Sequence, residues 1–186
     1  MTKFERFGKL LLLWFLLGEQ YFVLEALYRF VFKGGERAHI SMLAVGGLCC
    51  IAVGAINQMP RFYKLHVRVQ ALIGTIITLI IELIAGLILN VWLGFAIWDY
   101  SELWGNIYGQ VSITFALIWF FLMPFAIWLE DKIVFLYSLY LKYKGKSIDD
   151  MAIYEYTVRD IYKEFFSFDW RKILQYIRQR VSRILF

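Results

Sequence analysis

One carboxylate interrupts the most apolar stretch of the chain. Glu82 lies near the middle of residues 71–90, where a charged side chain costs about 2.5–3.5 kcal/mol on insertion scales. Gly86 and Asn90 follow at i+4 and i+8, so a helix places all three on one face, with Thr75 and Thr78 near the same side. This pattern predicts a polar groove that binds a proton, a cation or a polar substrate. The alternative is that Glu82 is protonated, or bonded to a neighbouring helix, and only fixes packing.

A polar and aromatic segment follows this apolar stretch and is made of Trp98, Asp99, Tyr100 and Ser101. Asp99 and Ser101 can hydrogen-bond the backbone of a turn. Trp98 and Tyr100 suit the membrane interface, which is the structural alternative to a role in binding. We expect Asp99, Tyr100 and Ser101 to form the outer mouth of a site.

Two amides come just before the next apolar run. Asn106 and Gln110 are four residues apart, which predicts that both project from the first turn of a helix. From there Gln110 would approach Glu82 or Asn90 across the bundle. We therefore expect an inner site made of Glu82, Asn90 and Gln110.

Three further residues belong to the predicted site. Glu25 and Arg29 form an i, i+4 acid–base pair, which either enters an apolar zone together or is a rim ion pair with Arg29 reaching the headgroups. His39 lies at the start of an apolar segment, where an interfacial residue is commoner than a ligand. The histidine and cysteine spacing matches no metal-binding pattern. We expect no metal and no cofactor.

No motif of an enzyme is present. The sequence contains no phosphate-binding loop ending in Gly-Lys-Ser/Thr, no His-Glu-x-x-His and no nucleophile elbow. No catalytic residue is predicted, and ATP-driven work would need a partner subunit.

The elements that must position these residues are apolar helices. The chain has 186 residues, is 61% hydrophobic and has a mean hydropathy of +0.60, whereas soluble domains are about 45–50% apolar. The apolar residues fall in blocks, which predicts an all-α membrane protein with four spans. We place the spans at 9–32, 40–56, 69–93 and 106–129, the second rich in the small residues that permit close helix approach.

The segment after the spans is basic and helical. Residues 133–141 are too short to cross a membrane, so they either extend the fourth span or lie on the surface. Residues 147–150 resemble a cap for a helix over 148–166. A second helix places apolar residues opposite five cations, which suits an anionic lipid surface: Arg171, Lys172, Arg178, Arg180 and Arg183. We therefore divide the chain into a bundle, 1–131, and a membrane-proximal tail, 132–186.

Positive charges predict the orientation. Residues 1–9 and 57–68 carry three each and the segment after Leu129 carries eleven, whereas 94–105 carries none. Both termini are therefore expected in the cytoplasm, although Lys33 and Arg37 in the first external loop run against the rule. The net charge of +5 is assigned to anionic lipid and not to nucleic acid.

These residues resemble the CmpB-like ABC-transporter type IV family of small bacterial membrane proteins. The resemblance covers about residues 18–130 and is carried by five groups: Glu25, Tyr28 and Arg29; His39, Ser41, Gly46 and Gly47; Glu82, Gly86 and Asn90; Trp98 to Ser101; and Gly109 with Gln110, followed by Trp119 and Phe120. The resemblance implies a multi-pass protein of the bacterial cell membrane.

Two functions are consistent with these observations. The first is a transport-related, permease-like component for a small polar or ionic solute or a lipid headgroup, working as a homo-oligomer or with a membrane or ATPase subunit. The second is a non-catalytic adaptor or assembly subunit that binds a partner through the second span and the basic tail.

Overall fold

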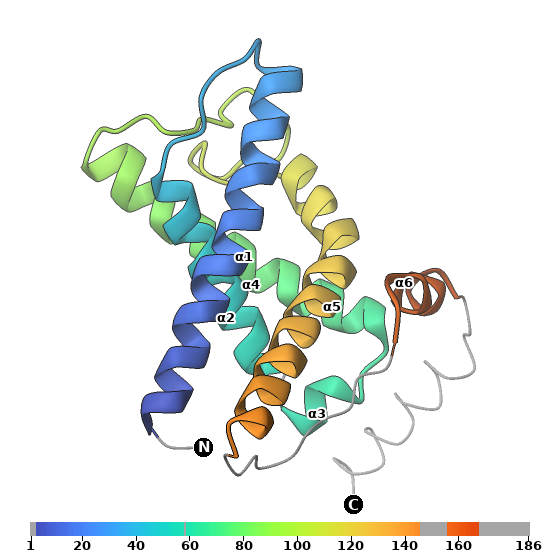
Figure 1. Ribbon diagram of the computed structural model, residues 1–186. Coiled ribbons are helices and arrows are strands. Elements are labelled where there is room, and N and C mark those ends of the chain that lie inside the picture. Colours follow the sequence, from blue (N-terminus) through green and yellow to red (C-terminus); the bar gives the residue numbers. More distant parts are fainter. Residues whose placement is uncertain (1–2, 58, 146–155, 168–186) are drawn as a thin grey trace, which may run out of the picture.

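The computed structural model describes residues 3–57, 59–145 and 156–167. Within these ranges the chain is helical and has no β-strand, which confirms the predicted all-α class. The elements, in chain order (Figure 1), are α1 Lys3–Phe32, α2 Ser41–Asn57, α3 Pro60–Tyr63, α4 Val67–Gly86, the π-helix η1 Leu87–Trp92, α5 Ile113–Tyr143 and α6 Val158–Phe166.

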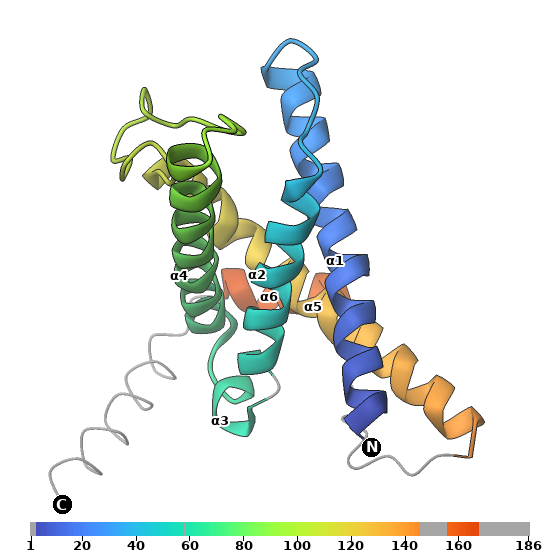
Figure 2. The ribbon, with the colours of Figure 1, turned by 90° about the vertical axis from the view of Figure 1, so that its left-hand side faces the viewer.

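The long helices form a bundle with two different ends. The connections 33–40 and 93–112 lie together at one end, which we call the loop end. The start of α1, the short helix α3 and the end of α5 lie at the opposite end, which we call the α3 end (Figures 1 and 2).

In the part of the chain that the structure describes, three helices are apolar and long enough to cross a membrane, whereas the sequence predicted four spans. They are α1, α4 continued by η1, and α5. The predicted second span corresponds to α2, whose 17 residues extend about 26 Å, slightly less than the apolar core of about 30 Å.

Glycines allow α2 to pack closely against α1 and α5. A Cβ on Gly46 would lie 2.3 Å from Tyr21 Cγ, and one on Gly47 would lie 2.6 Å from Trp14 Cδ1. A Cβ on Gly54 would lie 3.0 Å from the Glu130 carboxyl carbon of α5. The small residues of this helix therefore make room for aromatic and acidic side chains, as the sequence predicted for close approach.

The predicted start of the fourth span at residue 106 is wrong. Helix α5 begins at Ile113, after Ser112, whose hydroxyl accepts a 3.4 Å hydrogen bond from Phe115 N–H. Tyr108 and Gly109 have φ angles of 51° and 67°, a left-handed conformation that ends any right-handed helix. Asn106 and Gln110 consequently lie in the connection and not on a first helical turn.

Helix α5 also continues beyond the predicted end. Pro124 lies inside it, and the helix runs on to Tyr143. Of the two alternatives for residues 133–141, the structure therefore shows the extension of the preceding helix.

Within the described residues, the helix predicted over 148–166 is seen as α6, which begins at Val158. Thr157 and Asp160 form a reciprocal capping box there, in which Asp160 N–H donates to the Thr157 hydroxyl over 3.2 Å and Thr157 N–H to the Asp160 carboxylate over 2.8 Å. The predicted cap at 147–150 and the five lipid-surface cations Arg171, Lys172, Arg178, Arg180 and Arg183 lie outside the described residues.

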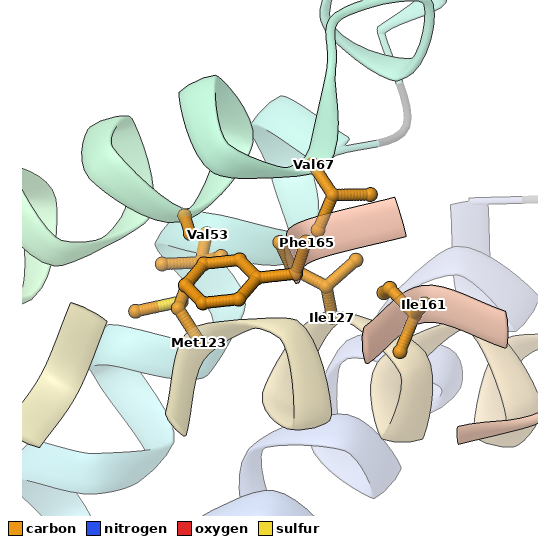
Figure 3. Close-up of a cluster of buried hydrophobic side chains, with 7 residues drawn as sticks. Val53, Val67, Met123, Ile127, Ile161 and Phe165 are labelled. Carbon is orange, nitrogen blue, oxygen red and sulfur yellow. The ribbon is translucent and has the colours of Figure 1, made fainter. Parts of the chain in front are cut away.

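Helix α6 is part of the main core. Ile161 and Phe165 are buried against α2, α4 and α5 (Figure 3), in one cluster with Val53, Val67, Ala71, Met123 and Ile127. Arg68 Nε also donates to Phe165 O, and Tyr162 donates to Phe121 O over 2.9 Å. This part of the predicted tail is thus fixed to the bundle.

Candidate functional site

Glu82 is buried between three helices. It lies on α4 with 5% of its surface exposed. Its Oε1 accepts hydrogen bonds from the Tyr21 hydroxyl of α1, at 2.6 Å, and from Trp119 Nε1 of α5, at 2.9 Å. Its second oxygen, Oε2, has no hydrogen-bond partner among the described residues. Glu82 therefore joins helices, as the structural alternative predicted, and keeps one oxygen for a further proton or ligand.

The two donors to Glu82 form a stacked pair. The rings of Tyr21 and Trp119 lie 5.1 Å apart with an interplanar angle of 21°. Tyr21 can occupy this place because Gly46 opposes it without a side chain. One oxygen of Glu82 is thereby held by a rigid aromatic pair from α1 and α5.

A pocket of about 170 Å³ adjoins Glu82 on its loop-end side. It is lined by residues of α1, α5 and the 93–112 connection, including Glu25, Tyr28, Tyr100 and Phe115. Tyr100 and Phe115 stack with ring centroids 4.3 Å apart. A mostly aromatic wall with two carboxylates suits a small ligand that carries a positive or hydrogen-bonding group.

A second pocket, of about 250 Å³, lies further towards the loop end. Glu25, Tyr28 and Tyr100 line both pockets, and the outer one adds charged residues: Arg29, Lys33, Glu36 and Asp99. We call the two adjoining pockets the loop-end vestibule. Together they lead from charged residues near the surface to the buried carboxylate.

Arg29 holds the wall of this vestibule. Its Nε donates to Glu25 Oε1 at 2.6 Å, and its Nη2 donates to the carbonyl oxygen of Ile97 at 2.6 Å. A weaker contact of 3.4 Å reaches Glu36. The predicted Glu25–Arg29 pair is therefore formed, with side chains only 11% and 12% exposed, and it also ties α1 to the 93–112 connection.

Asn90 and Gln110 meet, as predicted, although Gln110 is not helical. Asn90 Nδ2 donates to Gln110 Oε1 at 2.8 Å and to Trp98 O at 3.0 Å, while Asn90 Oδ1 accepts from Ile97 N–H at 2.7 Å. Gln110 Nε2 donates to Tyr108 O at 2.9 Å. Gly86 leaves the space for Gln110, since a Cβ there would lie 2.4 Å from Gln110 Oε1.

These amides serve the connection and do not line the pocket at Glu82. Each is engaged with backbone or with the other amide, so together they hold the 93–112 connection on the end of α4 and η1. Their role in binding a solute stays a prediction.

Replacing Asn90 with alanine should release this connection. Three hydrogen bonds are lost, and each buried group left without a partner costs about 1–3 kcal/mol. We expect faster hydrogen exchange at Ile97 N–H and throughout 93–112, with α1 and α2 unaffected. Ile88→Ala, a change at an exposed residue two positions away, is the matched control, and unchanged exchange in Asn90→Ala would contradict the prediction.

The residues predicted for the outer mouth lie in this connection. Asp99 is exposed and lines the outer pocket, and its Oδ1 accepts from Ser101 N–H at 2.8 Å. That backbone hydrogen bond, and then the Ser101 side chain, lower the pKa of Asp99. Burial raises the pKa of Tyr100 well above its ordinary value, so Tyr100 faces the vestibule as a neutral phenol.

His39 stands apart from the vestibule lining. It is exposed, its Nδ1 lies 2.8 Å from the Ser41 hydroxyl, and it precedes α2. No three histidine, cysteine, aspartate or glutamate side chains gather closely enough for a metal within the described ranges.

Several residues that shape the site were not predicted. Tyr21, Trp119 and Tyr28 are aromatic residues on apolar helices. Tyr28 and Trp119 belong to the residue pattern of the family resemblance, but nothing in the sequence placed any of the three beside Glu82. Asn57, Glu130 and Asp131 are buried as well, although their position at the ends of apolar runs suggested loops. The one sequence signal for this burial was that Glu130 and Asp131 are followed by further apolar residues.

Fold and site together define an all-helical protein with membrane-length apolar helices around a buried carboxylate. The family model described as "Putative ABC-transporter type IV" matches residues 12–165, and the chain belongs to this family. The match extends beyond the 18–130 covered by the resemblance and includes α6. No curated protein and no solved structure matches the chain.

Proposed function

We propose that this protein is a permease-like component that moves a small polar or ionic solute, or binds a lipid headgroup, and that Glu82 is its binding group. The observation that carries the proposal is the geometry of Glu82. One of its oxygens is fixed by Tyr21 and Trp119. The other is buried and has no hydrogen-bond partner in the part of the chain that is described, and it lies beside a vestibule that leads to the loop end. Buried acids in membrane helices commonly mark ion or substrate paths.

The membrane arrangement belongs to the same proposal. We infer that α2 crosses together with the three longer helices, so that four crossings leave both termini and the α3 end in the cytoplasm of a bacterial cell. The distribution of charge supports this orientation. The α3 end carries Lys3, Arg6, Lys9, Arg61, Lys64 and Arg68, whereas residues 94–105 at the loop end carry only acids.

Assembly with other subunits is also proposed. The sequence has no nucleotide-binding motif, so ATP-driven movement would require an ATPase partner. Four crossings are few for a solute path, which favours a homo-oligomer. The basic residues after 167 would bind anionic lipid.

The test is thermal unfolding of the purified protein in detergent against ions, amino acids, nucleosides and lipids, with wild type and Glu82→Gln compared. A ligand at about 100 times its dissociation constant adds about 2.7 kcal/mol. We expect at least one compound to stabilise wild type and not Glu82→Gln. Glu102→Gln, a change at an exposed acid, is the matched control and should bind as wild type does. A complete absence of ligand shifts, with Glu82→Gln as stable as wild type, would overturn the proposal in favour of the adaptor.

A further inference from the structure

A second buried polar cluster lies near the α3 end. Asn57 of α2 is 1% exposed, and Glu130 and Asp131 of α5 are each 3% exposed. Asn57 Nδ2 donates to Glu130 Oε2 at 3.1 Å and to Asp131 Oδ1 at 2.9 Å. Tyr156 donates its hydroxyl proton to Asp131 Oδ2. We call Asn57, Glu130 and Asp131 the inner cluster.

Other charged and titratable groups face the inner cluster from the surrounding elements. Lys9 of α1 interacts electrostatically with Glu130, and Lys132 of α5 with Asp131. The Cys50 thiol of α2 also faces Glu130. Two carboxylates and two ammonium groups leave the cluster close to neutral, so it has little attraction for an additional metal cation.

A small chamber separates the inner cluster from Glu82. Its volume is about 40 Å³, enough for two or three water molecules at about 10–15 Å³ each and too small for a hydrated alkali cation. Most of its lining is apolar, from residues such as Leu17, Val53 and Ile127. The polar side chains on it are Asn57 and Glu130 near the α3 end and Thr78 at its side, and Tyr21 and Trp119 close it towards Glu82. The aromatic pair also lines the pocket next to Glu82, so it forms the partition between chamber and vestibule.

One unpartnered polar atom belongs to a residue that lines this chamber, Asn57, and two others lie on the face of α4 that carries the lining residue Thr78. Among the described residues, three buried side-chain atoms have no hydrogen-bond partner: Asn57 Oδ1, Thr75 Oγ1 and Glu82 Oε2. Thr75, Thr78 and Glu82 share one face of α4 at i, i+3 and i+7, a length of about 10 Å. Buried polar atoms are normally satisfied, so this row of acceptors and donors fits mobile water or protons.

We propose that the chamber and the inner cluster form a proton site that exchanges protons with Glu82 past the Tyr21–Trp119 pair. The inference rests on the proposed function, because it makes the proton the ion that accompanies the solute bound at Glu82. In the transfer, the Glu82 carboxylic acid gives its proton to chamber water and becomes a carboxylate. The excess proton passes along the water, which hydrogen-bonds Thr78 and Asn57 Oδ1, and neutralises the Glu130 carboxylate.

The test measures proton flux in liposomes that contain the full chain and a pH-sensitive dye, driven by a valinomycin–potassium potential. Removing the partition with Trp119→Ala should let protons pass about tenfold faster than in wild type, equivalent to about 1.4 kcal/mol off the barrier. Adding Asn57→Leu or Glu82→Gln should return the flux to the wild-type level. Potassium leak, measured without valinomycin, should not change. Trp92→Ala, at a 79% exposed tryptophan, is the matched control.

Three results would overturn the inference. The first is a proton flux through Trp119→Ala that is no faster than through wild type. The second is a Trp119→Ala flux that stays the same when Asn57→Leu is added. The third is a potassium leak that rises with the proton flux, which would indicate an open water pore. If Trp119→Ala does not fold, Trp119→Phe keeps an aromatic ring at this position but makes it smaller and removes the Nε1–H donor to Glu82. No solute is added in these experiments, so their failure is distinguishable from a failure of the ligand-stabilisation test.

Discussion

Gly46→Val should prevent α1 and α2 from packing and remove the support of Glu82. Even the first carbon of a side chain at this position would lie 2.3 Å from Cγ and 2.4 Å from Cβ of Tyr21. Tyr21 cannot retreat without losing its hydrogen bond to Glu82 and its stacking on Trp119. Overpacking of a tight interface costs about 1–3 kcal/mol, occasionally more, and here one hydrogen bond to a buried acid is lost as well.

The measurement is the free energy of unfolding in detergent, obtained by denaturant titration, together with the yield of monodisperse protein. Ala55→Val is the control, since it places the same side chain at an exposed position of α2 and should change stability by less than about 0.5 kcal/mol. Gly46→Val and Ala55→Val of equal stability would contradict the packing described here.

Arg29→Met should destabilise the loop end by about 2–4 kcal/mol, somewhat below the 3–5 kcal/mol typical of a broken buried pair. The change leaves the Glu25 carboxylate without its cation and the carbonyl of Ile97 without its donor. We expect a smaller loss of stability than for a fully buried pair because the Arg29 and Glu25 side chains are still 12% and 11% exposed. We expect lower thermal stability and loss of any ligand shift that depends on the vestibule.

A double-mutant cycle separates the contribution of the Glu25–Arg29 ion pair to stability from that of the contact between Arg29 and Ile97 O. Glu25→Leu combined with Arg29→Met removes both charges and should recover most of the lost stability, because no buried charge remains unpaired. Glu36→Gln is the matched control. Glu36 is 61% exposed and lies 3.4 Å from Arg29, so this change should cost less than about 1 kcal/mol. A double variant as unstable as Arg29→Met alone would show that the contact with Ile97 dominates.

Local sequence predicted the helices well where one apolar run had clear ends. The spans starting near residues 9, 40 and 69 correspond to α1, α2 and α4, since apolar length and charge determine such segments directly. The prediction was wrong at residues 106–112 and, among the described residues of the later helix, at 156–157. In both places backbone conformation and capping decide the boundary, through Tyr108 and Gly109 in one case and Thr157 in the other.

Sequence alone determined that this chain is all-helical and unusually apolar, that Glu82 shares a helix face with Thr75 and Gly86, and that Glu25 pairs with Arg29. These are consequences of spacing within one helix. Tertiary structure alone decided which side chains meet Glu82, because Tyr21 and Trp119 are 61 and 37 residues away. It also decided that Asn57, Glu130 and Asp131 lie inside the protein, because burial depends on which helices surround a position and not on the residues next to it.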